Sequence, residues 1–118
     1  MEWKKLAPDI IRQRVVIEGT TDKPITPDQI AAYLSALSEE LNMRALQEPF
    51  VYQAEDVGHG AWIHWITSGA HFYTYNNTTP PLFTVDAYTC KPFSAERAAE
   101  FTKKYFKSRD LVWKEIEI

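Results

Sequence analysis

The stretch Leu82-Phe83-Thr84-Val85-Asp86-Ala87-Tyr88-Thr89-Cys90 has the pattern of a β-strand, and the elements on either side of it can be assigned in relation to this strand. It follows Asn76-Asn77-Thr78-Thr79-Pro80-Pro81, a segment that favours neither helix nor central strand and therefore predicts a loop. A second extended segment, Ala70–Tyr75, precedes that loop. The two extended segments and the loop between them predict a β-hairpin.

Further strands are predicted on both sides of this hairpin. Ile10–Gly19 is rich in β-branched residues and runs into a cluster of turn residues, and Ala61–Thr67 follows the glycines around His59. Leu111–Ile118 is the last predicted strand, with Val112, Ile116 and Ile118 on one face and Lys114 interrupting it. The segment Arg44–Glu55 stays ambiguous, because Pro49 breaks it and Phe50-Val51-Tyr52 is only a short β-like patch.

Two helices are predicted from their caps and their apolar spacing. Thr26-Pro27-Asp28-Gln29 matches a capping box, and an apolar stripe follows it at helical spacing: Ile30, Tyr33, Leu34, Leu37 and Leu41. Ser94 is a suitable N-cap for a second helix with Glu96 in its first turn. The buried face of that helix is predicted to consist of Ala95, Ala98, Phe101 and Tyr105.

The order of elements is summarised as β-α-β-β-α-β, without a repeat or a linker. This order predicts a single α+β domain over residues 1–118, a two-layer sandwich in which both helices cover one face of an antiparallel sheet. Several tryptophans and tyrosines lie on the strands, so the other face is expected to be covered by a second subunit in an isologous dimer.

Composition narrows the classes of function. An apolar fraction of 45% in 118 residues indicates one globular domain, and a net charge of -3 without a basic stripe argues against nucleic-acid binding. No segment has the length and apolarity of a membrane helix or a secretory signal, and a single cysteine cannot form an internal disulfide. We therefore expect a cytoplasmic protein without a membrane partner.

The polar residues alone are compatible with several kinds of functional site. Cys90 is either a small buried hydrophobic residue or an exposed, activated thiol. The spacings between His59, His64 and His71 argue against a metal site, so none is expected. A hydrolase triad of Ser68, His71 and Asp86 is disfavoured, because the glycines of a nucleophile elbow are missing.

The spacing of nineteen residues from His71 to Cys90, together with the ending Asp86-Ala87-Tyr88-Thr89-Cys90, resembles the prokaryotic S-adenosylmethionine decarboxylases. The similarity covers the whole chain loosely and residues 69–106 well. It implies the same fold, with Cys90 in the place of the family's proton donor. These enzymes cleave their own chain before a serine and convert it to a pyruvoyl group, which acts as an electron sink.

Within this resemblance, several positions differ from the family's pattern. Gly69 and Ala70 stand where the family has glutamate and the pyruvoyl-forming serine, and Tyr75 replaces its processing histidine. Asn77 and Thr79 stand where the family has the tryptophan and glutamate that hold the nucleoside. The resemblance thus implies catalytic candidates at Cys90, His71 and Ser68 and ligand-binding candidates at Tyr75, Asn77 and Asp86.

These departures lead to one hypothesis and two alternatives. The hypothesis is a homologue that neither cleaves itself nor decarboxylates, holds no cofactor, and either binds a small molecule or pairs with itself or a related decarboxylase. The first alternative is an active decarboxylase of polyamine biosynthesis that makes its pyruvoyl group from Ser68. The second is that the shared fold is coincidental and Cys90 belongs to the core.

Overall fold

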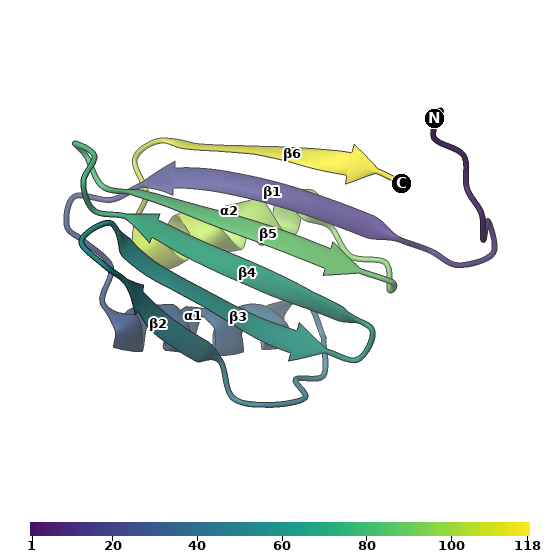
Figure 1. The fold of residues 1–118 in the computed structure, drawn as a ribbon, viewed down its shortest axis with the longest axis horizontal. Coiled ribbons are helices and arrows are strands. Elements are labelled where there is room, and N and C mark those ends of the chain that lie inside the picture. Colours follow the sequence, from purple (N-terminus) through teal and green to yellow (C-terminus); the bar gives the residue numbers. More distant parts are fainter.

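The computed structural model describes all residues, Met1–Ile118, and has two layers: one sheet with two helices behind it (Figure 1). The sheet is antiparallel throughout, with strand order β2-β3-β4-β5-β1-β6. No helix is long and apolar enough to cross a membrane. The elements are β1 Gln13–Thr20, α1 Pro27–Glu40, β2 Phe50–Ala54, β3 Gly58–Trp65, β4 Ser68–Tyr75, β5 Leu82–Thr89, α2 Ala95–Phe106 and β6 Leu111–Glu117.

The predicted α+β class is confirmed, with both helices on one face of the sheet. The order β-α-β-β-α-β was incomplete, because four consecutive strands lie between the two helices. The ambiguous segment around Phe50 forms the edge strand β2, which has only five residues. The first strand begins at Gln13 rather than at Ile10, and β3 covers Gly58–Trp65 rather than Ala61–Thr67.

Helix α1 begins as its sequence predicts. The Gln29 backbone N–H donates to Thr26 Oγ1 at 3.2 Å, and the Thr26 backbone N–H donates to Gln29 Oε1 at 2.9 Å. This reciprocal pair is a capping box, which satisfies two backbone donors that the helix itself leaves free. The apolar stripe predicted for this helix is buried in full: Ile30, Tyr33, Leu34, Leu37 and Leu41.

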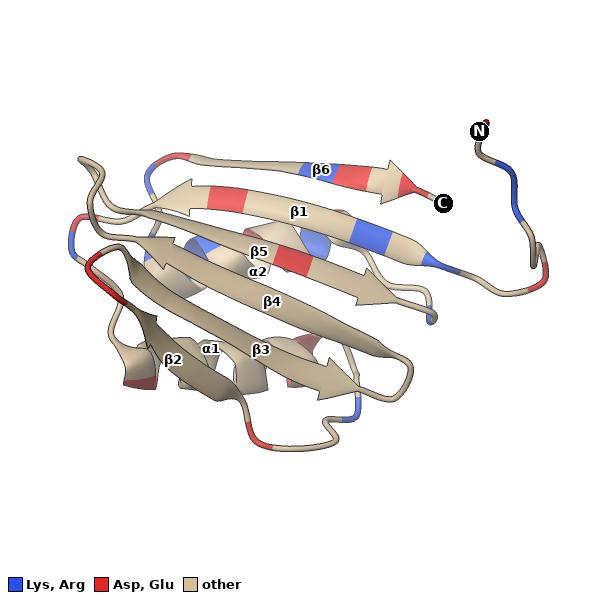
Figure 2. Cartoon of the chain, in the orientation of Figure 1, with Lys and Arg blue, Asp and Glu red and all other residues tan.

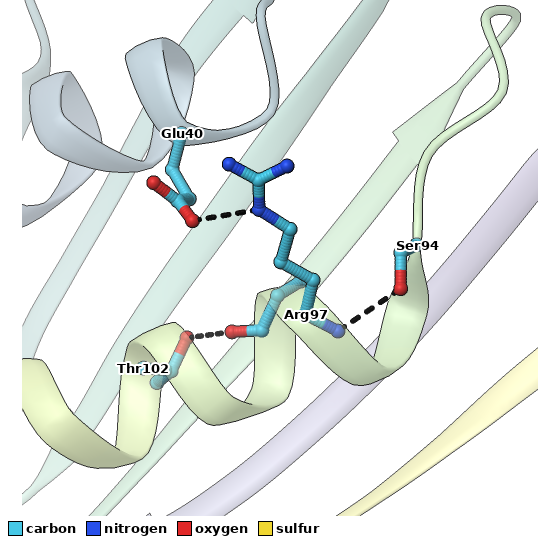
Figure 3. A network of polar contacts seen from close by, with 5 residues as sticks. Glu40, Ser94, Arg97 and Thr102 are labelled. Carbon is cyan, nitrogen blue, oxygen red and sulfur yellow. Dashed lines mark hydrogen bonds and ion pairs between the residues drawn. The ribbon is translucent and has the colours of Figure 1, made fainter.

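Helix α2 is joined to α1 by an ion pair at Arg97 and is capped at its own N-terminus by Ser94 (Figure 3). The Arg97 side chain donates to Glu40 Oε1 of α1 at 2.8 Å, while its backbone N–H donates to Ser94 Oγ at 3.1 Å. The prediction for the buried face of this helix was partly wrong. Ala95 and Ala98 are buried, but Tyr105 is exposed, and the small side chains of Ala99 and Thr102 are buried instead.

Buried and exposed side chains alternate along the strands, so the sheet has a packed face, which contacts the helices, and an open face on its other side. The packed face meets the helices with side chains such as Val15, Ile63, Phe72 and Val85, all essentially inaccessible to solvent. Figure 2 shows that the charged residues of the sheet lie on β5, β1 and β6, whereas β2, β3 and β4 have none. The open face therefore has a polar half and an uncharged half.

Candidate functional site

A tight turn connects β3 to β4 and shapes the environment of Cys90. Trp65 pairs with Ser68 across the two strands, which leaves only Ile66 and Thr67 in the turn. Thr67 has φ 57°, a left-handed backbone conformation that is rare for a β-branched residue. Such conformations concentrate at functional sites, where the surrounding structure holds them in place.

The turn places two hydroxyl groups against the Cys90 thiol. Thr67 Oγ1 is hydrogen-bonded to Cys90 Sγ, and Ser68 Oγ donates to the same sulfur at 3.8 Å. Ser68 Oγ also accepts the backbone N–H of Cys90 at 3.0 Å. Cys90 is half-buried and lies outside the apolar core, so solvent and small molecules can reach its thiol.

These hydrogen bonds favour the charged form of the thiol. The contact with Thr67, followed by that with Ser68, lowers the pKa of Cys90 below its ordinary value. The thiolate is the nucleophilic form of cysteine, so Cys90 is the candidate nucleophile beside this turn.

We expect Thr67→Val to slow alkylation of Cys90 by iodoacetamide near pH 7. Valine lacks the hydroxyl that lowers the pKa of Cys90, so the pKa rises toward its ordinary value and the thiolate fraction at pH 7 falls. Above about pH 10 the thiol is ionised in both proteins, and the two rates should converge. Thr67→Ser keeps the hydroxyl and serves as the control; superimposable pH profiles for Thr67→Val and wild type would contradict the assignment.

A pocket of about 500 Å³ lies beside this turn on the open face of the sheet. Asp86 of β5 is directly opposite His71 of β4 in the pairing register. Arg14 of β1 binds the Asp86 carboxylate with two hydrogen bonds, of 2.9 Å and 2.7 Å. The pocket is lined by Arg14, His64, Thr67, Ser68, Gly69, His71, Asp86, Tyr88 and Ile118.

The pocket presents both hydrogen-bond donors and acceptors. The hydrogen bond from Arg14 to Asp86, and the charge of that carboxylate, raise the pKa of Arg14. The pair is partly open to solvent, with 41% and 34% of the two side chains exposed, so both groups remain accessible to a ligand. No group of three or more histidine, cysteine, aspartate or glutamate side chains is arranged to hold a metal ion.

The site residues expected from the sequence fall into two places. Ser68, His71 and Asp86 line the pocket, and Cys90 contacts its rim through Ser68. Tyr75 lies at the other end of β4, seven residues from Ser68 or about 23 Å along an extended strand, and Asn77 follows it in the next turn. The chain therefore does not bring Tyr75 and Asn77 to the pocket.

Arg14 and Thr67 were not among the residues expected from the sequence. Arg14 is 72 positions from Asp86 and reaches it only because β1 pairs with β5 in this register. Thr67 reaches Cys90 only through its left-handed conformation in a two-residue turn. Both contacts join residues that are far apart in the sequence, so the pattern around Arg14 or Thr67 alone does not show which distant residue each one meets.

Ala70, which the resemblance aligns with the family's pyruvoyl-forming serine, lies on the packed face of the sheet. Only 1% of its surface is exposed, and it belongs to the apolar core between the sheet and the helices. Its methyl group carries no hydroxyl, so this position does not fit a pyruvoyl group.

Fold and site together define a two-layer α+β protein with a small polar pocket on the open face of an antiparallel sheet, beside a half-buried cysteine. Residues 17–117 match the family model of S-adenosylmethionine decarboxylase, and the chain belongs to this family. A comparison with curated proteins found no match.

A solved structure has the same fold. The crystal structure of the adenosylmethionine decarboxylase from Aquifex aeolicus VF5 superimposes with a TM-score of 0.74, covering 92% of this chain and 90% of that one. The two chains share 19% sequence identity. At this identity the similarity establishes the common fold.

Proposed function

We propose that this protein is a member of the S-adenosylmethionine decarboxylase family that does not form a pyruvoyl group and does not decarboxylate. The observation that carries the proposal is Ala70, which provides no hydroxyl at the family's serine position and packs in the core. The preceding Gly69 also lacks the carboxylate found in the family's pattern. An electron sink at this position would therefore have no chemical source in the chain.

The role proposed instead is binding of a small polar molecule in the pocket beside Cys90. The Arg14 guanidinium suits an anionic group of such a ligand, and the Asp86 carboxylate suits a cationic one. Asn77 and Thr79, which replace the family's nucleoside-binding residues, lie in the loop far from this pocket. The ligand is accordingly proposed to differ from that of the decarboxylases.

A second subunit is proposed to cover part of the open face. Strands of up to eight residues in a six-stranded sheet give a face of at most roughly 24 by 26 Å, or about 600 Å². A stable interface buries about 800 Å² per partner, which is of similar size. The second subunit would be another copy of this chain or a related decarboxylase whose activity it modulates.

Intact-mass spectrometry of the purified protein is expected to show one uncut chain. Self-cleavage needs a serine hydroxyl next to the peptide bond that breaks, and residue 70 has none. Treatment with hydrazine or phenylhydrazine should add no mass, since no ketone is present. Two fragments that meet near residue 68 or 70, the second of them carrying a hydrazine-reactive N-terminus, would overturn the proposal.

A second candidate function is an active decarboxylase whose pyruvoyl group derives from Ser68. It is favoured by one observation: Ser68 Oγ lies against the Cys90 sulfur and follows Thr67, whose left-handed backbone is strained. Ser68 would supply the electron sink, and Cys90 would be the adjacent proton donor.

The position of Ser68 argues against this alternative. Ser68 is displaced from residue 70 by roughly 7 Å along the strand, more than catalytic geometry tolerates. Under this alternative the wild type is cut before Ser68, and Ser68→Ala stays intact.

A further inference from the structure

A second pocket of about 500 Å³ lies where α1 begins and α2 ends. It is lined by residues 21–25 between β1 and α1, by Gln29 in the first turn of α1, and by residues 105–107 at the end of α2. Arg14 of the pocket beside Cys90 and Thr21 of this one are seven residues apart, roughly 23 Å of extended chain. The two pockets are therefore separate, and the volume of this one is typical of small-molecule sites.

Tyr105 forms an aromatic wall of this second pocket. Its ring packs edge-on against Tyr33 with centroids 5.3 Å apart, and the rings of Phe101 and Phe106 lie 5.7 and 5.2 Å away. Tyr33 is fully buried, so Tyr105 rests on the core, yet 38% of Tyr105 stays exposed. A ring that is held by three others and still open on one side can stack on a planar group with little further loss of conformational entropy.

The charges around the pocket favour an anion. Lys23 and Lys107 line it, and neither forms an ion pair within the chain. Asp22 also lines it, but its carboxylate lies 3.9 Å from Arg109 Nη2, which partly offsets the negative charge. The positive end of the α1 dipole and the negative end of the α2 dipole both reach the pocket and oppose each other. The two ammonium groups therefore make the pocket positive.

Gln29 adds a hydrogen-bond donor whose orientation is fixed. Its Oε1 accepts the Thr26 backbone N–H in the capping box at 2.9 Å. This bond determines which end of the amide faces the helix cap and leaves the Nε2 group free to donate elsewhere. An anionic group in the pocket can accept a hydrogen bond from Nε2 while the lysines neutralise its charge.

We infer that this pocket binds a small molecule that joins a planar ring to a phosphate group, the chemistry of a nucleoside monophosphate. The ring stacks on Tyr105, and the phosphate binds the ammonium groups of Lys23 and Lys107, which act as flexible point charges. This site is independent of the ligand proposed for the pocket beside Cys90.

Isothermal titration calorimetry with AMP tests the pairing of ring and phosphate. AMP is expected to bind, and adenosine and inorganic phosphate are each expected to bind at least about tenfold more weakly, because each lacks one of the two recognised groups. The inference would be overturned by an absence of AMP binding, or by an affinity for adenosine or inorganic phosphate equal to that for AMP.

Substitutions distinguish the pocket from general surface charge. Tyr105→Ala, and separately Lys23→Gln combined with Lys107→Asn, should each raise the dissociation constant of AMP at least about tenfold. Asparagine tolerates the left-handed backbone of residue 107, where φ is 51°. Tyr105→Phe keeps the ring, and Lys103→Gln removes a charge from the same helix outside the pocket lining, so both should leave the constant within about threefold. An unchanged constant in Tyr105→Ala or in the double lysine variant would contradict the site.

NMR chemical shifts locate the bound AMP in the wild-type chain. The backbone amides of Thr21 and Lys107 should shift during the titration, whereas the amide of Gly69 in the pocket beside Cys90 should not. Shifts confined to Gly69 and its neighbours would assign AMP to that other pocket and overturn the inference.

Discussion

Replacing Phe72 with alanine is expected to lower the free energy of unfolding by about 3–5 kcal/mol. Phe72 lies on the packed face of β4 and is fully buried. Its ring packs against Tyr33 of α1, Phe83 of β5 and Phe106 of α2, with centroid distances of 5.4, 5.7 and 5.6 Å. The substitution would leave a cavity where both helices and the sheet meet, which the rigid strands cannot close.

Urea denaturation followed by circular dichroism measures this loss. Tyr73→Ala is the matched control, because it removes an aromatic ring from the next residue of the same strand but on the open face, where Tyr73 is exposed. Its cost is expected to be smaller by at least about 2 kcal/mol. An equal loss of unfolding free energy in the two variants would contradict the assignment of Phe72 to the packed face and Tyr73 to the open face.

The faces of β4 illustrate what the sequence could and could not predict. Its extended character was evident, but aromatic residues occur at both parities, with Phe72 on one face and Tyr73 and Tyr75 on the other. Period-two alternation therefore does not reveal which face meets the helices. That choice depends on pairing with β3 and β5, which contribute Ala61 and Ala87 opposite Phe72 and Ala70 and so fix the packed face.

The buried face of α2 and the edge strand β2 were also difficult to predict from the sequence. In α2 the helical spacing suggested that Phe101 and Tyr105 were buried, but the small residues Ala99 and Thr102 face the core and the larger rings lie at its periphery. Thr102 is buried because its hydroxyl bonds Tyr33 Oη at 2.7 Å and thus has a polar partner. Strand β2 is too short for its periodicity to be decisive.

For the candidate site, the sequence identified most of the pocket's chemical groups but not the residues that hydrogen-bond to them. Cys90 was expected at the end of a strand and lies directly after β5. The sequence left open whether His71 and Asp86 meet, and the pairing of β4 with β5 places them opposite each other. Tyr75 and Asn77 were grouped with them through the family resemblance alone. The partners that tune the site, Arg14 and Thr67, come from strand register and turn conformation.

Replacing Trp65 with alanine is the second change expected to have a large effect, at about 3–5 kcal/mol of unfolding free energy. Trp65 ends β3 directly before the turn that holds Thr67 and Ser68 against Cys90, and only 2% of its surface is exposed. Its indole N–H donates to Ser38 Oγ of α1 at 2.8 Å, and that hydroxyl donates to the Leu34 carbonyl oxygen at 2.7 Å. Alanine would remove the ring and leave Ser38 without its buried donor.

Trp62→Ala provides the comparison, because Trp62 is three residues earlier on the same strand but belongs to the partly exposed open face. Its cost is expected to be at most about half that of Trp65→Ala. Hydrogen exchange adds a local measurement: the Leu46 amide donates to the His64 carbonyl at 2.9 Å, next to Trp65, and should exchange faster in Trp65→Ala than in Trp62→Ala under native conditions. Unchanged exchange at Leu46 would show that Trp65 does not anchor this end of β3. Faster exchange at Leu46 would show that the core stabilises the turn next to Cys90, because the Trp65 indole ring links the end of β3 to α1.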